Sequence, residues 1–131
     1  MEADAVRAVS ALRFAHAEEC LADSHRLLEA GSWRSAVNRA YYAAFHAMRA
    51  VLVLDGIDMK HHSGIISEFR RLYIKTGRFD AQYSRTISEL FNSRTGSDYD
   101  DYFLLTQEEA LAMTESASLF VKAVGEYLAS L

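Results

Sequence analysis

Apolar side chains recur at the three- and four-residue spacing of an amphipathic α-helix in five segments of the chain. A glycine follows each of the first three segments and is the last residue of the fourth, and glycine commonly ends helices. Ser32 can cap the second helix, and Thr106 with Glu109 has the spacing of a capping box before the last one. The five segments are residues 4–30, 33–54, 65–76, 80–96 and 107–128.

No segment shows the strict alternation typical of a half-buried strand, and the chain contains six glycines and no proline. The connections between the segments are mostly short, which favours antiparallel neighbours. The pattern predicts an all-α protein: an antiparallel up-and-down bundle of four to five helices, forming a single domain over residues 1–131.

The second segment is apolar around most of its circumference. One stripe runs from Val37 to Val51, and a stripe of alanines lies beside it. A helix of this kind must be covered on several sides, so we expect it to be central in the bundle or partly buried by a second subunit. The alanines are Ala36, Ala40, Ala43, Ala47 and Ala50.

Charge and cysteine content limit the classes of function. Because the formal net charge is −4, any contact with RNA must come from a local basic patch; the alternative is an acidic surface that only maintains solubility. The single cysteine, Cys20, excludes an internal disulfide and a zinc site made of thiolates alone. No apolar run approaches the ~20 residues of a membrane span, so we expect a cytoplasmic protein with no membrane contact.

Polar residues on the second helix are the first candidates for chemistry. One sector holds Asn38, Arg39, Tyr42, His46 and Arg49, and seven positions separate Arg39 from His46. That spacing is two turns, or about 10.5 Å along the axis, so both side chains could meet one phosphodiester with Tyr42 between them. Alternatively, Arg39 pairs with an acidic residue of another helix, and His46 packs as a half-buried histidine.

Arg94 continues the apolar stripe of the fourth helix, and an acidic, aromatic loop at residues 97–102 follows it. Arg94, Asp98 and Tyr99 are therefore candidates for phosphate or nucleotide binding, while an Arg94–Asp98 pair that only orders the loop is the alternative.

Lys60 and His62 precede the third helix, whose N-terminus is a natural anion site. The alternative is an ordinary solvated loop with Ser63 as the helix cap. Two adjacent histidines, His61 and His62, seldom face one metal ion, and no carboxylate lies at helical spacing from them. We therefore expect no metal site and no cofactor.

Three stretches carry a resemblance to a known family: residues 35–46, with the sequence SAVNRAYYAAFH; residues 60–69, with KHHSGIISEF; and Leu90-Phe91 through Arg94 to Asp98-Tyr99. They resemble the signature of the small stand-alone HEPN proteins, which are related to the toxin partners of minimal nucleotidyltransferases. With the last helix, the resemblance covers nearly the whole chain.

The resemblance implies a helical bundle that often forms homodimers, with two copies of the motif across a cleft. It implies a protein of a toxin–antitoxin or defence-type operon, with a minimal nucleotidyltransferase encoded nearby. In toxin members, an arginine and a histidine four to six residues apart act as a metal-independent endoribonuclease. Arg39 and His46 match them, with six residues between.

Two positions depart from the toxin pattern. Ala40 follows the arginine where a polar residue is usual, and Met48 replaces a tyrosine that some toxins have adenylylated. The alternative function is therefore a non-catalytic helical module that binds a nucleotide or a partner protein and works with a nucleotidyltransferase. A third possibility is that these polar residues form a structural network that fixes the bundle.

Overall fold

A computed structural model describes residues 2–101 and 103–131, and within these residues all regular structure is helical, as predicted. The third predicted helix is divided, because its second half is a π-helical turn, and a 3-10 turn ends the second. The elements are α1 (Ala3–Glu29), α2 (Trp33–Leu52), η1 (Val53–Asp55), α3 (His62–Phe69), η2 (Arg70–Ile74), α4 (Gln82–Tyr99) and α5 (Gln107–Ala129).

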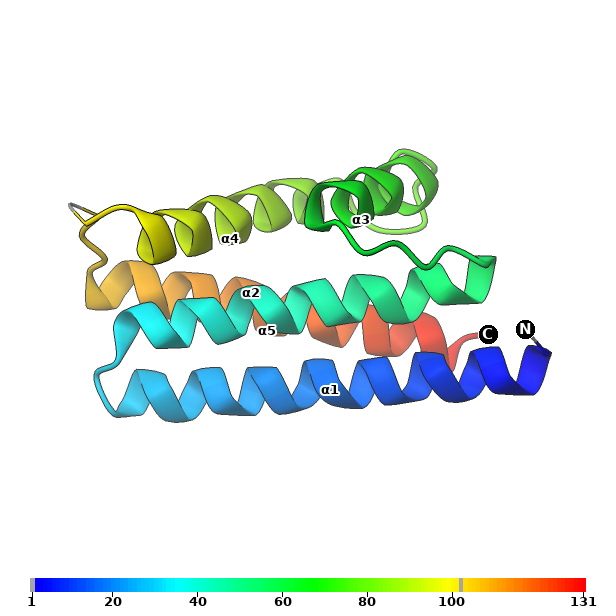
Figure 1. Ribbon diagram of the computed structural model, residues 1–131, viewed down its shortest axis with the longest axis horizontal. Coiled ribbons are helices and arrows are strands. Elements are labelled where there is room, and N and C mark those ends of the chain that lie inside the picture. The colour runs from blue at the N-terminus through cyan, green and yellow to red at the C-terminus, as the bar shows by residue number, and fades with distance from the viewer. Residues whose placement is uncertain (1, 102) are drawn as a thin grey trace.

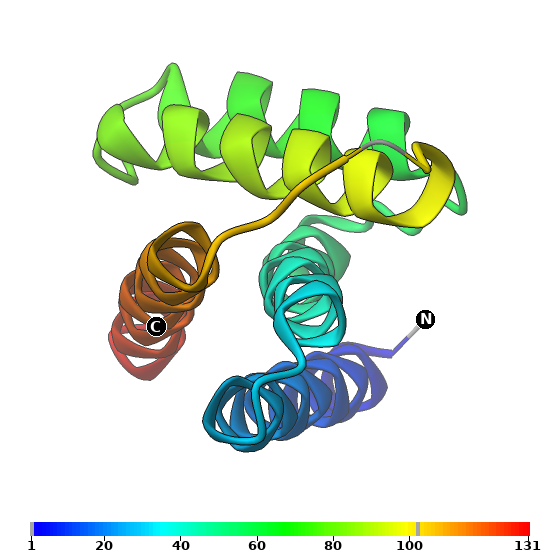
Figure 2. The same cartoon turned by 90° about the vertical axis from the view of Figure 1, so that its left-hand side faces the viewer.

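The helices form a bundle in which α1, α2 and α5 lie roughly along one direction (Figure 1). The α3 and α4 helices lie side by side and cross one side of this group (Figure 2). Within the pairs α1–α2 and α3–α4 the neighbours are antiparallel, as predicted. The α2 and α5 helices run in the same direction, because the α3–α4 pair returns the chain to the end where α2 begins (Figure 1).

The α2 helix is the central helix of the bundle. It contacts α1, α3, α4 and α5, and the five alanines of its small-residue stripe are 0 % exposed. One chain therefore covers the whole stripe, and the stripe gives no reason to expect a second subunit. Small side chains on α2 let α1 and α5 approach closely, which explains the stripe without a partner.

The helix ends follow the predicted signals in part. Gly31, Gly56 and Gly77 have φ values of 80°, 77° and 81°, a conformation that glycine adopts at little cost. Thr106 and Glu109 form the predicted capping box. Ser32 occupies the N-cap position of α2 but makes no side-chain cap hydrogen bond, so its predicted capping role is wrong.

The beginning of α3 also differs from the prediction. The helix begins at His62 with His61 at the N-cap position, so Ser63 lies inside the first turn and is not the cap. No side chain of the described residues caps this end.

The fourth helix does not end at Gly96, as predicted, but continues to Tyr99. A Cβ atom at position 96 would lie 2.5 Å from the ring of Phe103, so the glycine admits this ring against the helix instead of ending it. Arg34 donates to the carbonyl oxygens of Ser97 and Phe103, at 2.8 and 2.5 Å, and ties the same segment to α2. Tyr102, the last residue of the predicted loop, lies outside the described residues.

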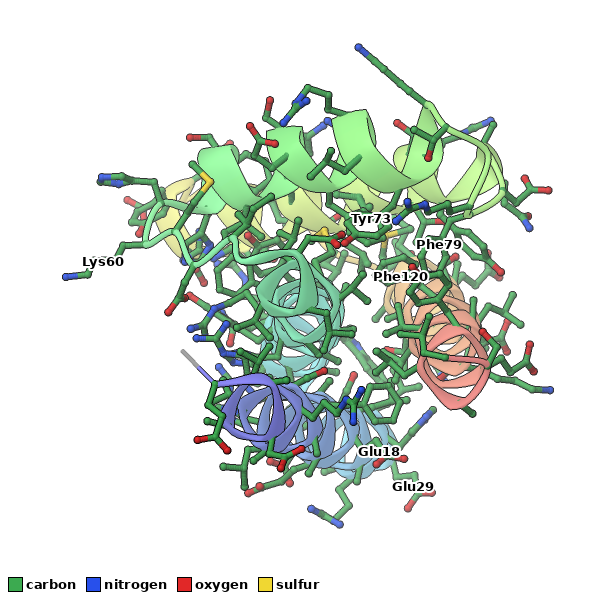
Figure 3. The ribbon with its side chains drawn as sticks, turned by 90° about the vertical axis from the view of Figure 1, so that its right-hand side faces the viewer. Glu18, Glu29, Lys60, Tyr73, Phe79 and Phe120 are labelled. Atoms are coloured by element: carbon green, nitrogen blue, oxygen red, sulfur yellow. The ribbon has the colours of Figure 1, made fainter. Side chains whose placement is uncertain are left out.

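Aromatic side chains fill the core beneath the α3–α4 layer. Tyr73, Phe79 and Phe120 converge there (Figure 3), and the Phe79 and Phe120 ring centroids are 6.3 Å apart. In the part of the chain that the structure describes, no helix is both long and apolar enough to cross a membrane.

Candidate functional site

Arg39 has no carboxylate partner among the described residues. Its Nε and Nη2 donate to Oδ1 of Asn38, at 3.2 and 2.8 Å, and its Nη1 lies 3.9 Å from Sγ of Cys20. The guanidinium carbon lies 5.0 Å from the centroid of the Tyr42 ring. The pairing of Arg39 with an acid of another helix is therefore not observed, and its charge remains available to an anion.

His46 lies two turns further along α2 and contacts α1. Its ring stacks on His16, with centroids 4.0 Å apart and an interplanar angle of 21°. The Tyr42 ring, between Arg39 and His46 in the sequence, lies 6.1 Å from the His46 ring. Within the described part of the chain, Nδ1 of His46 is buried and has no hydrogen-bond partner.

Burial, and then nearby positive charges, lower the pKa of His46 to about 4. The contributing groups are His16, Arg49, Arg39 and Arg13. At neutral pH the His46 ring is uncharged, which is the form that accepts a proton.

The surroundings of His46 form a basic patch on an acidic protein. Arg13 and Arg49 share one carboxylate, that of Asp58, at 2.9 and 3.9 Å. Asp58 is itself about half exposed, so it only partly offsets the two arginines. Together with the unpaired Arg39, they provide the local positive charge that contact with RNA requires.

A hollow of about 350 Å³ adjoins this patch. Arg49 and Lys60 line it, and Lys60 projects outward from the loop before α3 (Figure 3). Lys60 therefore lies at the edge of the patch. The remaining lining residues are Phe45, Asp58 and Met59.

Arg94 makes its polar contacts with side chains of the same chain. Its Nη2 donates to the hydroxyl of Tyr42 at 3.0 Å, and its Nε lies 3.0 Å from Oδ2 of Asp98. The guanidinium also lies over the rings of Tyr41 and Tyr42, at 5.4 and 5.5 Å. The predicted Arg94–Asp98 contact is present, although Asp98 belongs to α4 and not to a loop. Tyr42 is thus held between Arg94 and Arg39.

His62 lies in an aromatic cluster beside Tyr42. Its Nδ1 lies 2.7 Å from the Tyr41 hydroxyl, and its ring stacks on Phe45 with centroids 4.1 Å apart. Burial lowers the pKa of His62, and the charges of Arg94 and Arg49 lower it further. His62 therefore contributes to packing around α2.

The structure brings together most of the residues singled out in the sequence. One connected group contains Asn38, Arg39, Tyr42, His46, His62, Arg94 and Asp98. Tyr99 is 75 % exposed at the end of α4, and among the described residues it makes no hydrogen bond or ring contact with this group.

Sequence reasoning missed His16. The signal that the sequence offers is its spacing of three and four residues from Arg13 and Cys20, which places the three side chains on one face of α1. Met48, in contrast, is 0 % exposed, so its position faces the core and not the basic patch.

Comparison with known proteins gives one consistent result. The model of the HEPN domain matches residues 11–127. A "UPF0332 protein" of Thermotoga maritima is 31% identical over 88% of the chain and 87% of its own length. Two proteins of Methanocaldococcus jannaschii, each named "Putative toxin", are 32% and 35% identical, covering 87% and 86% of the chain and 78% and 83% of their own lengths.

Proposed function

This chain belongs to the HEPN family, and from that premise we propose that it is a toxin-type, metal-independent endoribonuclease whose centre is Arg39 and His46. The observation that carries the proposal is the neutral His46 ring amid three arginines, of which two share one carboxylate and the third, Arg39, has none among the described residues. RNA suits this arrangement, because its phosphates are negatively charged and its 2′-hydroxyl carries a proton that the neutral His46 can accept.

The reaction proposed is attack of a ribose 2′-oxygen on the adjacent phosphorus. The uncharged His46 accepts the proton of the 2′-hydroxyl while the new oxygen–phosphorus bond forms. Arg39 stabilises the negative charge that develops on the phosphorane oxygens. The bond from phosphorus to the 5′-oxygen then breaks, leaving a 2′,3′-cyclic phosphate.

The departing 5′-oxygen needs a proton, and His16 is the proposed proton donor. His16 lies 4.0 Å from His46, centroid to centroid, so one chain holds two imidazoles at the site. A second subunit is therefore not needed to supply the acid.

We also propose that the protein works as a homodimer. Leu12 is 71% exposed and precedes His16 by one turn on the same face of α1. A second copy that covers Leu12 would bring two basic patches together across a cleft. A minimal nucleotidyltransferase encoded nearby is the proposed partner, on the grounds of family membership.

The test is cleavage of single-stranded RNA by the purified protein in the presence of chelator, with DNA of the same sequence as control. His46→Ala removes the base and should slow cleavage by roughly 10²–10⁴-fold. Arg39→Ala should slow it by about 10²–10³-fold through loss of phosphorane stabilisation. His61→Ala and Arg85→Ala, at two exposed positions, are the matched controls.

RNA that stays intact with the wild-type protein, with or without added Mg²⁺, would contradict the nuclease proposal. Fluorescence anisotropy with labelled RNA then tests the second candidate, a module that binds RNA or a nucleotide without cleaving it. The contacts of Arg94 with Tyr42 and Asp98 favour this candidate. They leave Arg39 as the main cation beside Tyr42 that can bind an anion.

A further inference from the structure

Three potential metal ligands from two helices meet at the base of the basic patch. His16 and Cys20 are one turn apart on α1, and His46 faces them from α2. Their ligand atoms, two imidazole nitrogens and one thiol sulfur, all lie within 4.8 Å of one another. The sequence does not show that these three residues are neighbours, because His46 is 26 positions from Cys20 and the packing of α1 on α2 brings them together.

We propose that His16, Cys20 and His46 form a binding site for one thiophilic transition-metal ion of the Zn²⁺ class. On binding, the Cys20 thiol releases its proton to solvent, and the resulting thiolate and two neutral imidazoles donate electron pairs to the ion. The fourth position of a tetrahedral ion remains for water.

The distances permit this arrangement with a small movement. With Zn–N near 2.0–2.1 Å and Zn–S near 2.3 Å, tetrahedral ligand atoms are about 3.4–3.6 Å apart. The three atoms must therefore approach by no more than roughly 1.2–1.4 Å. His16 is exposed and can supply this movement by rotating its side chain, whereas Cys20 is 2 % exposed and held in place.

Two features of the site point to a ligand. Nδ1 of His46 is buried and, among the described residues, meets no hydrogen-bond partner, a condition that costs free energy unless something satisfies it. Among the described residues, the one polar contact of the Cys20 thiol is the long 3.9 Å contact from Arg39, which a metal ion can displace. Arg39 would then turn from the sulfur toward an anion.

The surrounding charges limit the affinity. Arg13, Arg39 and Arg49 all act on His46 and disfavour a dication, and the single thiolate offsets only part of this repulsion. We therefore expect a readily reversible site in place of a permanent structural one.

A metal ion bound at this site would also control RNA cleavage, a consequence that rests on the proposed function. A metal ion that holds His46 and His16 removes both the proton acceptor and the proton donor. Zinc should thus inhibit RNA cleavage by a protein that needs no metal to cleave.

The test uses Co²⁺ as a spectroscopic substitute for Zn²⁺ in the full chain. We expect one Co²⁺ per chain, with the visible bands of a tetrahedral ion and a thiolate-to-cobalt charge-transfer band in the near ultraviolet, both lost when Zn²⁺ is added. Cys20→Ser should abolish the charge-transfer band. His16→Ala should raise the Kd about tenfold or more, equivalent to at least ~1.4 kcal/mol.

The exposed His61 provides the control, because His61→Ala should bind Co²⁺ as the wild type does. If Cys20→Ser fails to fold, as judged by circular dichroism, His16→Ala at its exposed position carries the test alone. No charge-transfer band at millimolar Co²⁺, or a Kd unchanged by His16→Ala, would overturn the site.

The two proposals fail separately. A protein that cleaves RNA but shows no cobalt band overturns the metal site alone. A protein that binds cobalt through these residues but never cleaves RNA overturns the nuclease alone. Cleavage that is unchanged by saturating Zn²⁺ overturns the control of catalysis by the metal.

Discussion

The contact between Arg94 and Tyr42 should be measurable as a coupling free energy. Arg94 is 16 % exposed, and it donates to the Tyr42 hydroxyl, pairs with Asp98 and lies over two aromatic rings. A hydrogen bond from a charged group contributes about 1.5–3 kcal/mol, and a partly buried cation–π contact about 1 kcal/mol. Loss of the guanidinium also removes the cost of burying it, so Arg94→Ala should lower the free energy of unfolding by roughly 2–4 kcal/mol.

A double-mutant cycle isolates the hydrogen bond. Tyr42→Phe retains the ring and removes only the acceptor, so the coupling between Arg94→Ala and Tyr42→Phe should be about 1–2 kcal/mol in urea unfolding followed by circular dichroism. Asp98→Asn, combined with Tyr42→Phe, is the control and should show little coupling. A coupling below about 0.5 kcal/mol for the first pair would refute the structural role of Arg94 and favour its use by a ligand.

Three further predictions each concern a single residue. Leu12→Glu should convert the proposed homodimer to a monomer in light scattering, whereas a wild-type monomer at micromolar concentration would contradict the dimer. Gly96→Ala should cost about 1–2 kcal/mol, because the new Cβ meets the Phe103 ring at 2.5 Å, and faster proteolysis near residue 103 should accompany the loss. The folded-state pKa of His62 lies below its unfolded value, so the stability it contributes is present above about pH 6.5 and lost as the pH falls through the folded pKa. His62→Gln should therefore reduce the loss of stability between pH 7 and 5, and the exposed His61→Gln should not.

The spacing of apolar residues predicted the helices, because each helix has one face that must be buried. That face appears in the sequence as apolar residues three and four positions apart. The end of α4 was mispredicted for a non-local reason. Gly96 has the residue type of a helix terminator, but Phe103, seven positions later, packs on it while the helix continues. The role of a glycine depends on whether the position needs a positive φ or only space, and the sequence does not distinguish the two.

The candidate site was predictable where its residues share one helix. Arg39, Tyr42 and His46 follow from the spacing on α2, and the structure places them in one row. His16 and Cys20 could not be assigned to the same site, because the rotation of α1 against α2 decides which of its faces meets His46. The alanine stripe left two interpretations open, a central place in the bundle and burial by a second subunit. The close packing of the helices of one chain supports the first.

The position of the site on α2 has a consequence for how the proposed RNA cleavage can be controlled. The amides of this central helix belong to the cooperative unit of the bundle, so their hydrogen exchange should require an opening close to global unfolding. Arg39 and His46 are thus fixed to the part of the protein that deforms least. Distorting such a site would cost an inhibitor a large free energy. An inhibitor that covers the surface above Arg39 and His46 does not have to meet this cost.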